Sequence, residues 1–454
     1  MSQDRFDLVI RGGTVVTADG EGRADVAIRD GRIAQLGGSM SAPREVDAAG
    51  KLVIPGGVDM HVHLSPPWAD DFASGSRAAA AGGVTTFGNM GFPSPGESLI
   101  AVVERLAGEA SGASLVDFVI HPVLVDPSDE AIAEIPRLAE AGHTSIKIFM
   151  NHFGFDSRTG EYLRALEAAG KCGVLTMAHC EDGCLIDYAA TKLVGEGRGS
   201  LRHYAETRPS LSEHAAVNRM IALAEAAEAP VYIVHLGGAP ALAAARDAQA
   251  RGQRIYVETR PIYLYFTREV FERTDGALFV GDPPVGSAAD QEALWAGLSA
   301  SHVHTYCTDH AAWRKEQKLD PALTVTTARA GVSDLETYMP LLYSEGVRTG
   351  RLSLQRFIEV TSTNAAKLFG LFPQKGAIAI GSDADVVIWD PESTRVVSTE
   401  GILSRAGYSL YEGWTIVGAP SATICRGEIV YADGAITGDP AHGRLVSRGP
   451  TRRL

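Results

Sequence analysis

The centre of the chain repeats one unit eight times: a short apolar strand, a loop and an alanine-rich helix. Helical segments such as "SEHAAVNRMIALAEAAEA" and "GAPALAAARDAQARG" separate the strands. Eight strands with helical crossovers predict an α/β fold, a (β/α)8 TIM-like barrel, over residues 55–372. An open doubly wound sheet is the alternative, but no G-x-G-x-x-G motif follows the first strand. The strand segments are "KLVIPGGVDMHVHL", "GVTTFGNM", "LVDFVIHPVLV", "TSIKIFM", "GVLTMAHC", "APVYIVHLG", "QRIYVETRP" and "HVHTYCTDH".

Both ends of the chain differ in texture from its centre. The N-terminal stretch "FDLVIRGGTVVTADGEGRADVAIRDGRIAQLGG" alternates β-branched runs with Gly and Asp-Gly turns, which predicts antiparallel hairpins. The same texture returns in "GSDADVVIWDP" and "GWTIVGAPSATICRGEIVYADG" near the C-terminus. We therefore expect one small β domain built from residues 1–54 and 373–454.

Composition and charge limit the functional classes. The chain has 454 residues, of which 41 are basic and 55 acidic, for a net charge of −14. This acidic balance, without a basic block, argues against a nucleic-acid partner. Neither a signal peptide nor an apolar run of about 18 residues is evident, so we expect no membrane association and a cytoplasmic location. The five scattered cysteines fit reduced thiols.

Polar residues recur near the carboxyl ends of the predicted strands. In the first strand, Asp59, His61 and His63 share one face because side chains alternate with period two. Barrel enzymes place their chemistry at these strand ends. We therefore predict that His61 and His63 belong to a metal site completed by residues from later strands, namely Lys147, His179, His235 and Asp309.

Each of these positions also has a simpler explanation. A single buried histidine is more often a hydrogen-bonded core residue than a metal ligand, and a buried lysine more often forms a salt bridge. Together, however, four histidines and one aspartate match the ligand preferences of zinc-class ions. If Lys147 reacts with carbon dioxide, its carbamate becomes an anionic ligand with two oxygens. Such a group could bridge two divalent ions, with Asp309 and a bridging hydroxide balancing the remaining charge.

A family resemblance rests on these same motifs. "PGGVDMHVH", the lysine of "KIFM", the later histidines, "TDH" and "TSTNAAKLFGLFPQKGAIAIGSDADVVIWDP" together resemble the cyclic amidohydrolases of the hydantoinase, dihydropyrimidinase and allantoinase group. The resemblance implies a binuclear centre, most often of Zn²⁺, and a catalytic role for Asp309 as proton shuttle. It also implies a β-sandwich from both termini and a homotetramer or homodimer. The implied ligands are His61, His63, carboxylated Lys147, His179, His235 and Asp309.

The activity implied by the resemblance is opening of a cyclic amide or imide, such as a hydantoin or dihydropyrimidine, to an N-carbamoyl or related open-chain product. A first alternative is hydrolysis of another ring or amide: allantoin, dihydroorotate, a cyclic imide or a lactam. A second is a non-catalytic scaffold of the dihydropyrimidinase-related kind. The intact set of candidate ligands argues against the scaffold.

Substrate contacts are where the chain departs from that family. Relatives carry a tyrosine five residues after the metal-binding lysine, where it binds the developing oxyanion, and this chain has His152 there. An imidazole N–H could replace the phenol as a catalytic donor, or His152 could be an ordinary loop residue. Arg260 and Asp282 stand where relatives have cysteine and serine, and either could contact substrate or serve structure. Ala330 and Gly331 replace an Asn-Gly pair whose backbone touches the substrate ring.

Aromatic residues occur on two of the predicted βα loops. Trp68 follows the first strand, behind Pro66 and Pro67, and Phe153 and Phe155 follow the lysine strand. These rings could form an apolar wall that selects a bulky substituent on the substrate ring, or they could pack within their loops.

Overall fold

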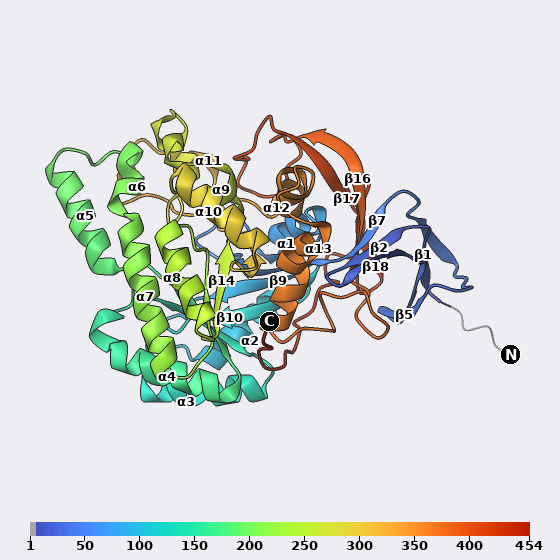
Figure 1. Ribbon diagram of the computed structural model, residues 1–454, viewed down its shortest axis with the longest axis horizontal. Coiled ribbons are helices and arrows are strands. Elements are labelled where there is room, and N and C mark those ends of the chain that lie inside the picture. Colours follow the sequence, from blue (N-terminus) through green and yellow to red (C-terminus); the bar gives the residue numbers. More distant parts are fainter. Residues whose placement is uncertain (1–5) are drawn as a thin grey trace.

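Eight parallel strands close into a barrel in the computed structural model, which describes residues 6–454 (Figure 1). Strands β8–β10 form one hydrogen-bonded sheet and β11–β15 another. Parallel bridges at Val123–Lys147 and Val62–His310 join the two sheets at both edges. The predicted barrel is therefore confirmed. Its strands are β8 (Gly57–Val62), β9 (Val84–Gly91), β10 (Asp117–Pro122), β11 (Ser145–Phe149), β12 (Leu175–His179), β13 (Val231–Ile233), β14 (Ile255–Thr259) and β15 (Thr305–Tyr306).

Helices between the strands cover the barrel on its outside (Figure 1). Several begin at a side chain that caps the first backbone N–H groups, as Ser98, Ser128 and Ser287 do. Others are short and serve the loops. The helices are α1 (Phe72–Ala81), α2 (Leu99–Ala110), α3 (Asp129–Glu140), α4 (Thr159–Cys172), α5 (Gly183–Gly195), α6 (Tyr204–Thr207), α7 (Ser210–Ala226), α8 (Ala239–Ala250), α9 (Pro261–Tyr265), α10 (Ala288–Ser299), α11 (Lys315–Lys318), α12 (Tyr338–Leu342), α13 (Leu354–Ile358) and α14 (Asn364–Leu368).

Both chain ends contribute to a second, two-sheet domain, seen at the right of Figure 1. A four-stranded sheet has the order β5-β4-β1-β6, and a seven-stranded sheet has the order β19-β18-β17-β16-β7-β2-β3. Apolar residues from both ends, such as Ile10, Ile28, Val386 and Ile424, share one core. The predicted sandwich is thus confirmed, while its boundaries at 54/55 and 372/373 stay a prediction. The strands are β1 (Leu8–Arg11), β2 (Thr14–Thr17), β3 (Gly20–Arg23), β4 (Val26–Arg29), β5 (Arg32–Leu36), β6 (Arg44–Asp47), β7 (Leu52–Pro55), β16 (Val386–Val396), β17 (Thr415–Cys425), β18 (Glu428–Ala432) and β19 (Ala435–Ile436).

The N-terminal strands are not the simple series of hairpins that we predicted. β1 pairs with β6 in parallel, and β2 pairs with β7 in parallel. The chain changes sheets between β1 and β2 at Gly12, which has a φ of 73°, and Gly13. A Cβ at Gly13 would lie 2.4 Å from a methyl group of Val53, so glycine allows the close approach of this crossing to β7.

A buried ion cluster joins the two domains. The Lys375 ammonium lies 2.5 Å from Asp117 of β10, 3.0 Å from Asp383 and 2.7 Å from Asp385, which precedes β16. Arg426 also donates to Asp117. Lys375, Asp117 and Asp385 are almost fully buried, so each charge depends on its partners.

The last residues of the chain run beneath the barrel, at the end where the strands begin. The backbone N–H groups of Val446, Arg448 and Thr451 donate to the carbonyls of Phe118, Gly142 and Gly173. We call residues 443–454 the C-terminal strap. The Arg448 side chain points inward from it and donates to the Ser145 hydroxyl at 2.8 Å.

Two sequence expectations concern the chain as a whole. Across residues 6–454, no helix combines the length and apolar character needed to cross a bilayer. The five cysteines are all free thiols.

Candidate metal centre

A cavity of about 400 Å³ opens at the carboxyl ends of the barrel strands. All six predicted metal ligands line it. His61 and Lys147 lie within β8 and β11, and His179 is the last residue of β12. His63, His235 and Asp309 follow the ends of β8, β13 and β15. The barrel therefore gathers side chains from five strands at one point.

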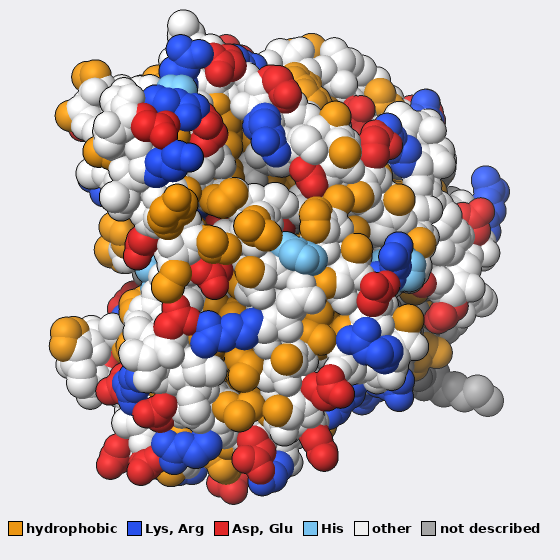
Figure 2. All heavy atoms as spheres, turned by 60° about the vertical axis from the view of Figure 1, so that its left-hand side comes forward, with side chains coloured by type: hydrophobic (Ala, Val, Ile, Leu, Met, Phe, Trp, Pro, Cys, Tyr) orange, Lys and Arg blue, Asp and Glu red, His pale blue; other side chains and the backbone are white. Residues whose placement is uncertain are grey.

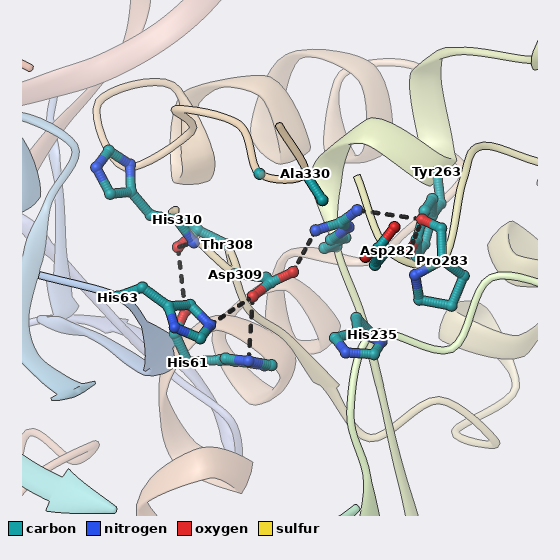
Figure 3. A network of polar contacts seen from close by, with 12 residues as sticks. His61, His63, His235, Tyr263, Asp282, Pro283, Thr308, Asp309, His310 and Ala330 are labelled. Atoms are coloured by element: carbon teal, nitrogen blue, oxygen red, sulfur yellow. Dashed lines mark hydrogen bonds and ion pairs between the residues drawn. The ribbon is translucent and has the colours of Figure 1, made fainter. Parts of the chain in front are cut away.

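Asp309 lies between two of the histidines (Figure 3). Its Oδ1 atom is 3.1 Å from His61 Nε2 and 3.2 Å from His63 Nε2. Ligand atoms of His61, His235 and Asp309 all lie within 4.8 Å of one another, and the three side chains are buried. Imidazole nitrogens and a carboxylate oxygen at this spacing suit a zinc-class ion.

A second pair of nitrogens faces the same cavity. His179 Nδ1 lies 2.9 Å from His235 Nε2. Burial lowers the pKa of His63 to about 4, and it also lowers the pKa of His179 and His235. These rings are therefore neutral at pH 7, which is the form that binds metal.

Two buried glutamates hold the outer nitrogens of these histidines. Glu258 Oε1 lies 2.7 Å from His61 Nδ1, and Glu181 Oε2 lies 2.8 Å from His179 Nε2. A carboxylate on one ring nitrogen fixes the tautomer and directs the other nitrogen toward the metal. Glu258 is held in turn by the Tyr232 hydroxyl at 2.8 Å.

Lys147 is fully buried, and its Nζ atom has no hydrogen-bond partner among residues 6–454. The amine lies 4.9 Å from the centre of the Phe149 ring. Burial lowers its pKa to about 8. An orphaned amine in a cavity lined by histidines fits a site whose bonding is completed by other groups, such as the carbamate and metal ions suggested by the sequence.

Arg260 is the closest cationic neighbour of Asp309 within this cavity wall. Its side chain is 1% exposed, donates to Asp309 Oδ2, and lies over the Tyr263 ring at 4.7 Å. Burial alone would raise the pKa of Asp309, but His61 and Arg260 hold that pKa well below its ordinary value. Asp309 is thus a carboxylate at neutral pH.

Aromatic rings form one wall of the cavity. Trp68 and Phe153, both predicted as substrate contacts, line it together with Phe92 and Phe149. The Trp68 ring lies 4.6 Å from His63 and 5.8 Å from Phe92, between centroids. Phe155 is not part of this wall. It is 1% exposed and packs on Tyr162 with 4.8 Å between ring centroids.

Four more residues singled out in the sequence also line the cavity, namely His152, Asp282, Ala330 and Gly331. The His152 ring lies beside the aromatic wall, 5.9 Å from the Phe153 ring between centroids. The carbonyl of Ala330 accepts from Trp313 Nε1 at 2.7 Å, and the N–H of Gly331 donates to the Val280 carbonyl at 3.0 Å. These two backbone groups already have partners within the protein.

Comparison with known proteins places this geometry in a family. Residues 52–430 match the amidohydrolase family. The chain belongs to the amidohydrolase family. It is 39% identical to the D-hydantoinase of Ralstonia pickettii, over 98% of this chain and 99% of that protein. It is 37% identical to the D-phenylhydantoinase of Escherichia coli O9:H4 (strain HS), over 98% of each chain.

Solved structures agree with the assignment of this chain to the amidohydrolase family. A D-hydantoinase structure matches with a TM-score of 0.94 and 38% identity, covering 98% of this chain and 100% of that one. The dihydropyrimidinase from Brevibacillus agri NCHU1002 matches with a TM-score of 0.93 and 34% identity, covering 98% and 99%.

Several residues of this amidohydrolase site were not identified from the sequence. Glu181 and Glu258 carry no motif of their own, although Glu258 directly follows the apolar residues "IYV", where a charge is unexpected. Phe92 follows β9 in the same way that Trp68 follows β8, so its place on a βα loop was the available signal. Asp59, which shares a strand face with His61, accepts from the Thr308 hydroxyl at 2.6 Å and so anchors the segment before Asp309.

Proposed function

We propose that this amidohydrolase uses two divalent metal ions to hydrolyse the ring of a 5-substituted hydantoin or a related cyclic amide. The product is an N-carbamoyl or similar open-chain acid. One observation carries the proposal: four histidines, one aspartate and a buried lysine, whose amine has no hydrogen-bond partner within residues 6–454, face a single cavity with an aromatic wall. The names of the relatives, D-hydantoinase and D-phenylhydantoinase, point to the same class of ring.

His61, His63, His179, His235 and Asp309, together with carboxylated Lys147, would hold the two ions, most often Zn²⁺. A neutral amine is the form that adds to carbon dioxide, and the lowered pKa of Lys147 favours that form. Bound ions would supply Lewis acidity to the amide carbonyl and lower the pKa of the attacking water.

Asp309 is the proposed proton carrier. Water adds to the carbonyl carbon and loses a proton to the Asp309 carboxylate. The C–N bond then breaks, and the same proton passes to the leaving nitrogen, so that Asp309 is regenerated. Arg260, donating to Oδ2, keeps that carboxylate oriented toward the histidines.

His152 is the proposed donor to the oxyanion. It lines the cavity on the loop after β11. Burial, with Arg208 nearby, lowers its pKa, so the ring is neutral at pH 7 and carries one N–H. A neutral imidazole can stabilise a developing negative charge by donating that hydrogen, as a phenol would.

The aromatic wall supports a bulky substituent on the ring carbon. Trp68, Phe92, Phe149 and Phe153 offer apolar surface next to the metal ligands. Phe153 is 42% exposed, so a flat substituent could cover it and remove apolar area from water.

The test combines metal analysis with a substrate panel. Purified protein is analysed for metal per chain and then assayed with hydantoin, 5-phenylhydantoin, 5-benzylhydantoin, dihydrouracil, allantoin, dihydroorotate and a cyclic imide. We expect two divalent ions per chain and fastest turnover of an aryl-substituted hydantoin. If the protein holds two ions but turns over a different ring fastest, that ring becomes the proposed substrate. If the protein binds no metal, the proposed metal-dependent hydrolysis is excluded.

We further propose that the chain forms a homodimer or homotetramer. Large apolar side chains are exposed on two adjacent outer helices, Tyr188 and Val194 on α5 and Leu211 on α7. Figure 2 brings this side of the molecule forward and shows apolar side chains gathered across it. Such patches favour association. Light scattering coupled to gel filtration should give a mass of two or four chains, and a monomer would contradict the proposal.

A further inference from the structure

A line of charged groups leads away from the metal-facing histidine His179. Its outer nitrogen, Nε2, lies 2.8 Å from Glu181 Oε2. Glu181 is 1% exposed, and the same oxygen accepts a hydrogen bond from Arg208 Nη1. The orientation of His179 therefore depends on a carboxylate whose own charge is balanced by Arg208.

The other side of the same guanidinium reaches the cavity wall. Arg208 Nη2 lies 2.8 Å from Asp282 Oδ2, and the buried Tyr204 hydroxyl donates to Asp282 Oδ1. Asp282 lines the cavity of the proposed metal centre. Arg208 itself lines a separate cavity of about 370 Å³ behind this wall, together with Glu181 and Pro283. Its direct contacts with the catalytic cavity therefore run through Glu181 and Asp282, and beyond them it acts on His152 through its charge.

We propose that Arg208 is a positioning residue that fixes the metal-facing histidine His179 and the cavity-wall residue Asp282 relative to each other. This inference rests on the proposed function, in which His179 holds a metal ion and the cavity lined by Asp282 holds the substrate. Glu181 carries the constraint to the metal side, and Asp282 carries it to the substrate side.

Arginine is suited to this role by its shape. Its planar fork presents several N–H donors in fixed directions, so two carboxylates can be held at once. A lysine ammonium is a single point charge and cannot reproduce both contacts with the same geometry. Loss of the guanidinium would also leave Glu181 buried and negative beside His179, a state that a protein avoids by rearrangement.

The wall is tied to the metal ligands from its other end as well. Arg260 donates to Asp309 with one nitrogen and to the Pro283 carbonyl with another, at 3.3 Å. The segment Asp282–Pro283 is thus connected to His179 through Arg208 and to Asp309 through Arg260. Figure 3 shows the Asp309 end of this arrangement, with Asp282 and Pro283 beside it. A shift of the segment Asp282–Pro283 would therefore change the positions of both His179 and Asp309.

The experiment separates the two arms of the network. Glu181→Gln cuts the metal arm, Asp282→Asn weakens the substrate arm, and Arg208→Met cuts both. Arg202→Met is the matched control, because Arg202 is 57% exposed and pairs with Glu272 on the surface. Metal affinity is measured by dialysis against graded chelator, and metal geometry by the visible spectrum of the cobalt-substituted protein. The Michaelis constant and kcat are measured with 5-benzylhydantoin at saturating metal.

We expect Glu181→Gln to weaken metal binding by about 10- to 100-fold and to change the cobalt spectrum, with KM close to the wild-type value. Asp282→Asn should raise KM without changing metal affinity. Arg208→Met should both weaken metal binding and raise KM. Arg208→Lys should restore either the metal affinity or the KM of the wild type, but not both. Arg202→Met should behave as wild type.

Wild-type metal affinity and KM in Arg208→Met would overturn the inference. If Arg208→Met does not fold, the single-arm variants decide, and unchanged metal affinity in Glu181→Gln overturns it equally. Failure of the proposed function is distinguishable, since wild-type protein would then bind no metal or hydrolyse no ring.

Discussion

A buried ammonium without a hydrogen-bond partner is costly, and Lys147 has no such partner in the described part of the chain, so we expect its charge to be removed or neutralised. We predict that Lys147→Ala loses both metal ions and activity while keeping the barrel intact, because alanine cannot form the carbamate that we propose as a metal ligand. Metal analysis and far-ultraviolet circular dichroism test this. Lys171→Ala, at a side chain 71% exposed, is the control. A Lys147→Ala protein that retained two ions and full activity would exclude the bridging role.

His152 gives a second test at the level of single residues. If its N–H stabilises the oxyanion, His152→Ala should lower kcat by about 10²- to 10³-fold with metal content unchanged. His152→Tyr should recover part of that loss, because a phenol donates a hydrogen bond from the same loop. Steady-state kinetics on metal-saturated protein measures both. Equal kcat for His152→Ala and wild type would make His152 an ordinary loop residue.

Trp68 is expected to affect selection rather than catalysis. Trp68→Ala removes apolar surface from the wall, so kcat/KM should fall more for 5-benzylhydantoin than for unsubstituted hydantoin, with a difference of about 10-fold or more. Metal content should not change. Equal losses for the two substrates would show that the ring packs within its loop instead.

At this scale the sequence was most informative about polar residues at strand ends. His61, His63, Lys147, His179, His235 and Asp309 stand out because a polar side chain ending an apolar strand is unusual, and the barrel brings them together. Glu181 could not be placed in the same way, because its contact with His179 depends on how the loop after β12 turns. Phe155 illustrates the converse, since loop position alone cannot tell a cavity ring from a packed one.

Among the elements, the C-terminal strap has the clearest energetic role. Deleting residues 443–454 removes backbone hydrogen bonds to β10 and to the loops before β11 and β12, and it exposes the apolar surface under Val446. We predict a loss of about 3–6 kcal/mol in the free energy of unfolding. Urea denaturation measures it. Deletion of residues 453–454 alone, which are exposed, should cost little, and similar stability of both truncations would contradict the prediction.

The barrel could be predicted from the sequence because its repeating elements, apolar strands buried on both faces and alanine-rich helices, have distinct residue patterns. Which strands pair with each other in the sandwich was harder to predict from the sequence. Parallel pairing of β1 with β6 and of β2 with β7 depends on the crossing at Gly12 and Gly13, which a pattern of alternating residues does not encode. The strap was not predicted either, because it binds mainly through its backbone.

At the scale of the whole molecule, we expect the buried ion cluster between the barrel and the sandwich to contribute to the free energy of unfolding. Lys375→Met would leave Asp117, Asp383 and Asp385 buried without their shared cation, so we predict a loss of about 3–5 kcal/mol in the free energy of unfolding. Lys51→Met is the control, since Lys51 lies 4.0 Å from Asp390 at the surface and should contribute less than about 1 kcal/mol. Thermal unfolding of both variants measures the difference. Equal midpoints would mean that apolar packing alone joins the two domains.

The pairing of β7 with β16 also has a consequence during protein synthesis. β7 (Leu52–Pro55) emerges from the ribosome early, whereas its antiparallel neighbour β16 (Val386–Val396) emerges only after the entire barrel. At about 5–20 residues per second, the delay is on the order of tens of seconds. Throughout that time the nascent chain carries an open strand edge, which can pair with any other unfinished chain nearby. Chaperone supply and translation speed should therefore affect the yield of this protein even when the stability of its finished fold is unchanged.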